Sequence, residues 1–65
     1  MKKEFYQSTL DFVYKKAKEL DIAFISLYWN LDGVISCAVQ DEEIDFNDFS
    51  FLMVYKNTIL EDCKK

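Results

Sequence analysis

Two cysteines are the strongest nucleophiles in this sequence. A thiol becomes catalytic when a neighbouring base or cation stabilises its thiolate, and the 65 residues include neither histidine nor arginine. Cys37 falls in a stretch that we expect to face the core, whereas Cys63 falls in a basic tail beside Lys64 and Lys65. We therefore predict two free thiols, a buried structural one at Cys37 and a more exposed one at Cys63, and no cysteine chemistry.

Carboxylates are the other side chains that could supply an acid and a base. The chain has 12 of them, and two at a suitable separation can cleave a glycosidic bond. Most fall in stretches that are typical of turns and a connector, and so short a chain has little room for an enclosing cleft. We therefore predict a solvated acidic surface, no enzyme activity and no cofactor.

The acids are also segregated along the chain. Residues 21–55 contain no base, and the lysines lie before and after this stretch. A field of that sign attracts basic proteins and repels nucleic-acid phosphates, so we expect no direct binding to nucleic acid. The seven acids of the stretch are Asp21, Asp32, Asp41, Glu42, Glu43, Asp45 and Asp48.

Residues 44–49, IDFNDF, resemble the second half of an EF-hand loop and the start of its exiting helix. The resemblance implies calcium binding only if the preceding positions supply oxygen ligands and a glycine. The first three side-chain ligand positions would fall on Cys37, Val39 and Asp41, and Glu42 stands in place of the glycine. The oxygen ligands that calcium needs are therefore mostly absent. We therefore predict no metal site and expect Asp45 to cap the last helix instead.

The first element is predicted to be an amphipathic helix from Lys3 to Leu20. Apolar side chains recur at intervals of four, three, four and three residues, which places them on one helical face. Lysines gather near its C-terminus, where they favour the helix dipole, and Asp21 ends the pattern. The apolar face consists of Tyr6, Leu10, Val13, Ala17 and Leu20, widened by Phe5 and Phe12.

Residues 22–40 are predicted to form a β-hairpin around which the domain is organised. Asn30 and Gly33 bound a turn signal, because Asn bonds its own backbone and Gly accepts a positive φ. A three-residue loop closed by a glycine bulge places alternate residues on a core face and leaves an apolar outer face with no helix to cover it. The core face holds Ile25, Leu27, Trp29, Ile35, Cys37 and Val39, and the outer face includes Phe24, Tyr28 and Val34.

The last element has two interpretations. Apolar residues at helical spacing favour a helix from about Asp48 to Asp62, with Asp45, Asn47 or Asp48 as its N-cap. Alternation over residues 49–55 favours a third strand instead. We prefer the helix, which gives an α+β fold of order α-β-β-α with a two-stranded antiparallel hairpin flanked by two helices; the alternative is α-β-β-β-α.

Size and composition bound the class of protein. Residues 1–65 are expected to form a single domain, which buries only about 60% of its extended surface. Apolar residues make up 51% of the chain, too many for disorder and enough to leave some for another chain to cover, so we predict a homodimer. The start lacks the apolar core of an export signal and no apolar run can span a bilayer, which predicts a cytoplasmic protein with no membrane contact.

The leading hypothesis is a small acidic protein-binding module. Its most concrete form is an inhibitor or antitoxin-like regulator, a nucleic-acid mimic that blocks the basic surface of a partner enzyme, because complementary charge speeds encounter and excludes wrong partners. Phages and mobile elements encode compact acidic proteins of this kind, which act in the host cytoplasm. The alternative is a non-catalytic structural or assembly subunit of a larger complex. The predicted partner-binding residues are Asp41, Glu42, Glu43, Asp45, Asp48, Phe24 and Tyr28.

Overall fold

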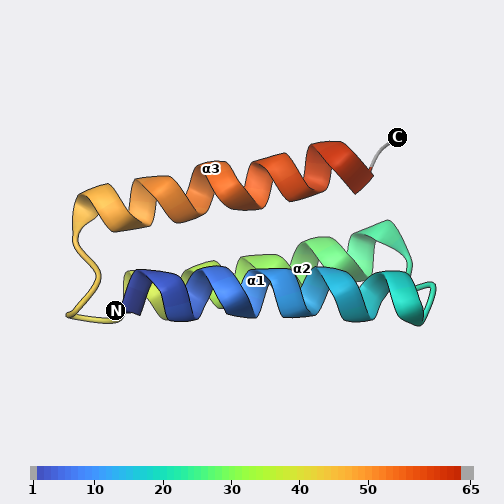
Figure 1. Cartoon of the computed structure of the whole chain (residues 1–65), viewed down its shortest axis with the longest axis horizontal. Helices are drawn as coiled ribbons and strands as arrows, with labels where there is room; N and C mark the ends of the chain where they lie inside the picture. Colours follow the sequence, from blue (N-terminus) through green and yellow to red (C-terminus); the bar gives the residue numbers. More distant parts are fainter. Residues whose placement is uncertain (1, 64–65) are drawn as a thin grey trace.

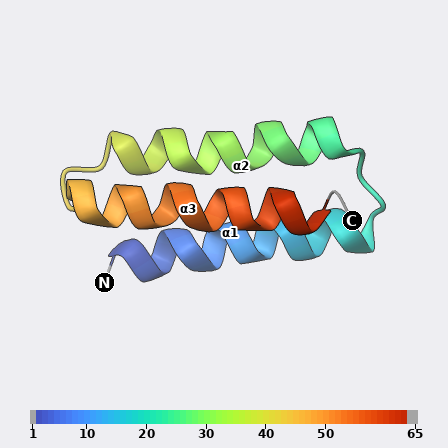
Figure 2. The same ribbon diagram turned by 90° about the horizontal axis from the view of Figure 1, so that it is seen from above.

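Three α-helices make up the computed structural model, which describes residues 2–63 (Figure 1). They are α1 (Lys2–Glu19), α2 (Phe24–Val39) and α3 (Phe46–Cys63). Successive helices run in opposite directions along the long axis of a body that measures 33 × 17 × 16 Å (Figure 2). Each helix packs against the other two. Residues 2–63 therefore form an all-α three-helix bundle that contains no strand.

Apolar stripes from all three helices meet in one core. Its largest fully buried side chains are four leucines, Leu10 of α1, Leu27 and Leu31 of α2, and Leu52 of α3. Burial of each such side chain stabilises the fold by about 1.5–3 kcal/mol. The other buried apolar residues are Tyr6, Ala17, Ile35, Ala38, Ile59 and Leu60.

The predicted α+β class is wrong, because the expected hairpin over residues 22–40 is helix α2. Leu27, Leu31, Ile35 and Ala38 recur every three or four residues, and this helical period buries all four in the core. Two strands would have placed Leu31 in an exposed turn. Packing against α1 and α3 therefore stabilises a helix over residues 24–39 more than it would stabilise two strands.

The turn signal inside this stretch is used within the helix. Asn30 donates its side-chain N–H to the carbonyl of Ser26 one turn earlier, at 2.9 Å. Gly33 lies in the middle of α2 with a φ outside the left-handed region. Neither residue therefore reverses the chain.

The predicted core face of the hairpin is correct for Leu27 and Ile35 alone among its six residues. Trp29 is 64% exposed, Ile25 and Val39 are 59% exposed, and Cys37 is exposed. Their places on the helix, away from the buried stripe, explain the difference, because a helix of period 3.6 separates residues that a strand of period two puts together. The prediction of a buried structural thiol at Cys37 is therefore wrong.

The first predicted helix is confirmed to within one residue at each end. α1 buries Tyr6, Leu10 and Ala17, and leaves Phe5 and Phe12 of the expected wide face 59% exposed. Its amphipathic pattern is strong enough to specify the helix from local sequence.

α1 ends in a Schellman-type C-cap. Asp21 adopts a left-handed φ of 54°, its N–H bonds the carbonyl of Lys18 at 3.4 Å, and the N–H of Ile22 bonds the carbonyl of Ala17 at 2.9 Å. This pair of bonds satisfies carbonyls that the last turn leaves without helical partners. An aspartate occupies the position where glycine is usual.

The predicted last helix is confirmed as α3, and the rival strand over residues 49–55 is wrong. α3 begins at Phe46, two residues earlier than predicted, because Asp45 is the N-cap. Its Oδ1 accepts the N–H of Asp48 at 2.8 Å, and its carbonyl accepts the N–H of Phe49 at 2.9 Å. Of the three predicted capping residues, Asp45 is the one that caps.

Two tyrosine–aspartate hydrogen bonds tie α1 to α3. Tyr14 of α1 donates its hydroxyl to Asp62 Oδ2 at 2.6 Å, and Tyr55 of α3 donates its hydroxyl to Asp11. The bond to Asp62 raises the pKa of Tyr14 to about 12, because a neighbouring carboxylate disfavours the tyrosinate.

Candidate protein-binding surface

Four large apolar side chains stay exposed together on α2, and we call them the aromatic patch. Phe24 is 39% exposed, Ile25 59%, Tyr28 37% and Trp29 64%. They share one side of the helix because residues four apart lie one above the other. The rings of Tyr28 and Trp29 meet edge to face, with centroids 5.8 Å apart, an arrangement that aromatic pairs favour.

The aromatic patch exists because α2 is apolar around more of its circumference than the bundle covers. Only Ser26, Asn30, Asp32 and Ser36 among its 16 residues are strongly polar. A surface helix of a globular protein ordinarily turns charged and polar side chains away from the core. An exposed apolar face of this kind is typical of an interaction site.

A groove between α2 and α3 borders the aromatic patch. Phe24 and Tyr28 line it from α2, and Asn57, Leu60 and Glu61 line it from α3. The groove therefore joins the aromatic patch to a second helix and has both apolar and hydrogen-bonding groups.

A buried lysine contacts the aromatic patch from α3. Lys56 is only 6% exposed, and its Nζ lies 5.8 Å from the centroid of the Tyr28 ring. The face of an aromatic ring attracts a cation at this range, and the aliphatic stem of lysine packs well on apolar neighbours. Lys56 thus contacts the ring of Tyr28 at the edge of the groove.

Apart from the buried Lys56, the charged residues that adjoin the aromatic patch along α2 and the groove are acidic. Asp21 precedes α2, Asp32 follows Tyr28 by one turn, and Glu61 lines the groove. α2 itself has no basic residue. The surroundings of the aromatic patch therefore favour a partner with basic side chains.

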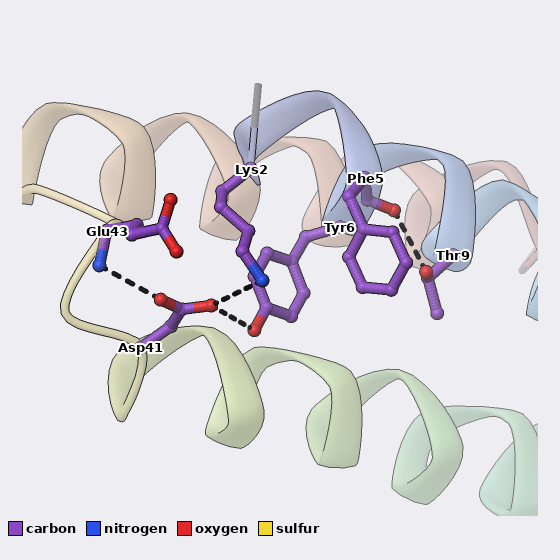
Figure 3. A network of polar contacts seen from close by, with 6 residues as sticks. All are labelled: Lys2, Phe5, Tyr6, Thr9, Asp41 and Glu43. Carbon is purple, nitrogen blue, oxygen red and sulfur yellow. Dashed lines mark hydrogen bonds and ion pairs between the residues drawn. The ribbon is translucent and has the colours of Figure 1, made fainter.

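The predicted acidic site lies at the other end of the bundle, in the loop between α2 and α3 and in the first turn of α3. Asp41 is the best fixed of its residues (Figure 3). Its Oδ2 accepts the hydroxyl of Tyr6 at 2.8 Å and lies 3.5 Å from Lys2 Nζ, and its Oδ1 accepts the backbone N–H of Glu43 at 2.9 Å. The N–H of Glu43 and the hydroxyl of Tyr6 lower the pKa of Asp41, because both bonds favour the carboxylate.

The Asp41 network holds the α2–α3 loop against the start of α1. The hydrogen bond from the Tyr6 hydroxyl to Asp41 raises the pKa of Tyr6, because a neighbouring carboxylate disfavours the tyrosinate. The Asp41 side chain is only 16% exposed. Asp41 therefore serves the fold, as Asp45 does by capping α3.

Two more of these acids, Glu43 of the loop and Asp48 of α3, lie beside lysines. Lys2, Lys3, Glu4, Glu43 and Asp48 line one shallow pocket, so the base-free stretch of the sequence meets the basic start of α1 in space. Because opposite charges partly cancel each other, these lysines reduce the negative electrostatic field that the acidic stretch of the sequence predicts.

The structure does not bring the seven predicted partner-binding residues together. Phe24 lies at the start of α2, and the acidic loop follows its end at Val39. At 1.5 Å per residue the helix places Phe24 about 22 Å, and Tyr28 about 16 Å, from Val39. The exposure predicted for Phe24 and Tyr28 is confirmed, whereas Asp41, Glu42, Glu43, Asp45 and Asp48 form a separate group at the opposite end (Figure 1).

Sequence reasoning missed Ile25 and Trp29, which the hairpin placed in the core. The signal that would have found them is the helical spacing of Leu27, Leu31 and Ile35. Once these residues define the buried stripe, Ile25 and Trp29 fall outside it.

The two cysteines are free thiols in different surroundings. Cys37 is exposed on α2, and Cys63 lines a pocket with Ala17, Ile22 and Leu27. Within residues 2–63, no group of three potential ligands is close enough to hold a metal ion.

No protein-family model matches the chain, and neither a curated protein nor a solved structure matches it significantly. Among the helices of residues 2–63, none combines the length and the apolar character needed to cross a bilayer.

Proposed function

We propose that this protein is a small non-catalytic protein-binding module, and that the aromatic patch is its binding surface. The observation that carries the proposal is the exposure of Phe24, Ile25, Tyr28 and Trp29 on one side of one helix. Trp and Tyr are the residues that most often dominate the energy of protein interfaces. Full burial of each large apolar side chain contributes about 1.5–3 kcal/mol, so a partner that covers the patch gains a strong driving force.

The proposal places the module in a reducing compartment such as the cytoplasm. Its two cysteines are free thiols, and Cys37 is exposed. Free thiols are stable where the cell keeps cysteines reduced.

A matched pair of variants tests the proposal. Ile25 lies in the patch and is 59% exposed, and Val54 lies on α3, outside it, and is 65% exposed. We expect Ile25→Glu to abolish capture of proteins from the cell extract and Val54→Glu to preserve it, while both keep wild-type helicity by circular dichroism. Equal capture by wild type and Ile25→Glu would contradict the proposal.

A second candidate function is that of an inhibitor whose acidic surface covers a basic surface of a partner enzyme. The specific observation in its favour is that five acids lie in or beside one loop, Asp41, Glu42, Glu43, Asp45 and Asp48. Because Asp41 and Asp45 hold the fold together, reversing their charge would confuse binding with unfolding.

Glu42 and Glu43 are exposed acids of this loop whose carboxylates neither bond Tyr6 nor cap α3. Reversing their charge therefore separates the two functions. Loss of capture with Glu42→Lys and Glu43→Lys together, and not with Ile25→Glu, identifies the acidic inhibitor. The opposite result identifies the aromatic patch. A permanent assembly subunit would use the same patch, and it differs from a regulator in remaining bound to its partner throughout purification.

A further inference from the structure

The exposed side of α2 carries a regular pattern that extends beyond the aromatic patch, and we call it the outer stripe. Its residues are spaced by four, three, four and three positions along the helix, the spacing of a coiled-coil seam. Ile25, Trp29 and Val39 are 59–64% exposed, Ser36 is exposed, and Asp32 is half-buried. The outer stripe consists of Ile25, Trp29, Asp32, Ser36 and Val39.

Asp32 stands at the centre of the outer stripe and is the one charged residue of α2. Its carboxylate has no hydrogen-bond or ion-pair partner among residues 2–63. A partner that covers the stripe removes water from this carboxylate, which is costly unless a cation or donor replaces the water. The occupant must therefore place a basic side chain opposite Asp32.

A second copy that docks through its own outer stripe does not meet this requirement. Because Asp32 is the middle residue of five, pairing two outer stripes in register sets Asp32 against Asp32 whether the helices run parallel or antiparallel. Like charges opposed across a helical seam destabilise the pair. The stripe is thus matched to a different sequence.

The sizes of the flanking residues describe the occupant further. Trp29 is the largest residue of the stripe and Ser36 the smallest, one step to either side of Asp32. Interdigitation requires a small side chain opposite Trp29 and a large one opposite Ser36.

Resting on the proposed function, we infer that the outer stripe binds one amphipathic helix of another protein, which has a lysine or arginine at the centre of its apolar stripe. Such a helix lies along α2 and converts the three-helix bundle into a four-helix one. The contact spans the 14 residue steps from Ile25 to Val39, about 21 Å.

Two synthetic helical peptides test the inference. Each spans the stripe, lacks tryptophan and carries the same apolar residues, and they differ only in a central Lys or Glu. Trp29 is the only tryptophan of the chain, so its emission should shift to the blue when a helix covers it. We expect the Lys peptide to bind wild type about tenfold more tightly than the Glu peptide.

Charge exchange provides the control. Asp32→Lys should reverse the preference for the two peptides, whereas Glu42→Lys, the same change in the distant loop, should preserve it; helicity by circular dichroism confirms that both variants fold. Equal binding of the two peptides would overturn the basic partner and leave the proposed function in place.

Two other results would also overturn the inference. If neither peptide binds, an amphipathic helix is not the occupant. The proposed function is then still tested separately, by comparing protein capture by Ile25→Glu and by Val54→Glu. Sedimentation as a dimer whose Trp29 emission shifts to the red on dilution would identify a second copy as the occupant.

Discussion

Replacing Gly33 with alanine should stabilise the protein. Gly33 lies inside α2 with a φ outside the left-handed region. Apart from Asp32, Val34 and neighbouring helix backbone, a methyl group there meets no atom of residues 2–63 within 4 Å. Alanine is favoured over glycine in a helix interior by about 0.8–1 kcal/mol, because glycine loses more backbone entropy on folding. For a domain of this size a gain of about 1 kcal/mol raises the melting temperature by about 4–8 °C.

The sign of the change separates a helix from a hairpin at this position. In a turn closed by glycine the residue has a positive φ, and L-alanine there is destabilising. Chemical synthesis permits the mirror-image control, since D-alanine favours positive φ and should destabilise α2 by about 1–2 kcal/mol. Urea unfolding followed by helical circular dichroism measures both. Stabilisation by D-alanine and destabilisation by L-alanine would refute the helix at Gly33.

Three further predictions concern helix ends and pH. Ala23→Ser should stabilise the fold by about 1 kcal/mol in urea unfolding, because Ala23 caps α2 without a side-chain acceptor. The pKa of Asp41 is lowered from its ordinary value of 3.8, so its contribution to stability is present above that value and is lost as the pH falls through the lower pKa of the folded state. Acid unfolding should therefore be less steep in Asp41→Asn. The pKa of Tyr14 is raised from 10.0 to about 12, so its contribution is present below pH 10 and is lost as the pH rises towards 12. Tyrosinate absorbance should show a component near pH 12, which Tyr14→Phe removes.

Each of these has a result that counts against it. A neutral or destabilising Ala23→Ser would mean that α2 does not begin at Phe24. Identical acid unfolding of wild type and Asp41→Asn would show that the bonds from Tyr6 and Glu43 do not persist in solution. A tyrosine titration without a component near pH 12 would show that the hydrogen bond between Tyr14 and Asp62 does not form in solution.

The sequence predicted α1 and α3 because their local signals agree with the fold. α1 has a regular apolar stripe, and α3 has an N-cap at Asp45 followed by apolar residues at helical spacing. In α2 the local signals favour a hairpin, since β-branched and aromatic residues surround a turn-like Asn-Leu-Asp-Gly segment. What decides the outcome is burial of Leu27 and Leu31 against two helices that are distant in sequence, and local patterns do not contain that information.

The candidate surface was predictable in part. Phe24 and Tyr28 were expected to be exposed, although as one face of a strand. The register of the predicted hairpin points the Trp29 side chain into the core, whereas the helix exposes it. The role of Asp41 was out of reach of sequence reasoning, because its partner Tyr6 is 35 residues away.

The partition of α2 into buried leucines and an exposed aromatic patch also explains how so small a domain holds together. Few residues are available for a core, and hydrogen bonds from Tyr6, Tyr14 and Tyr55 to aspartates reinforce the contacts of α1. Apolar residues beyond the buried stripe are then free for a partner. A domain with more polar residues on α2 would keep the same core and lose the binding surface.

The environment of Trp29 in the isolated monomer is the most direct test of the exposed patch. Trp29 is 64% exposed on α2, and it is the sole source of tryptophan emission. At concentrations where sedimentation shows a monomer, its emission should match that of indole in water and should be quenched readily by a neutral quencher such as acrylamide. Emission shifted to the blue and protected from the quencher in the monomer would place Trp29 in the core and contradict both the helix and the binding surface.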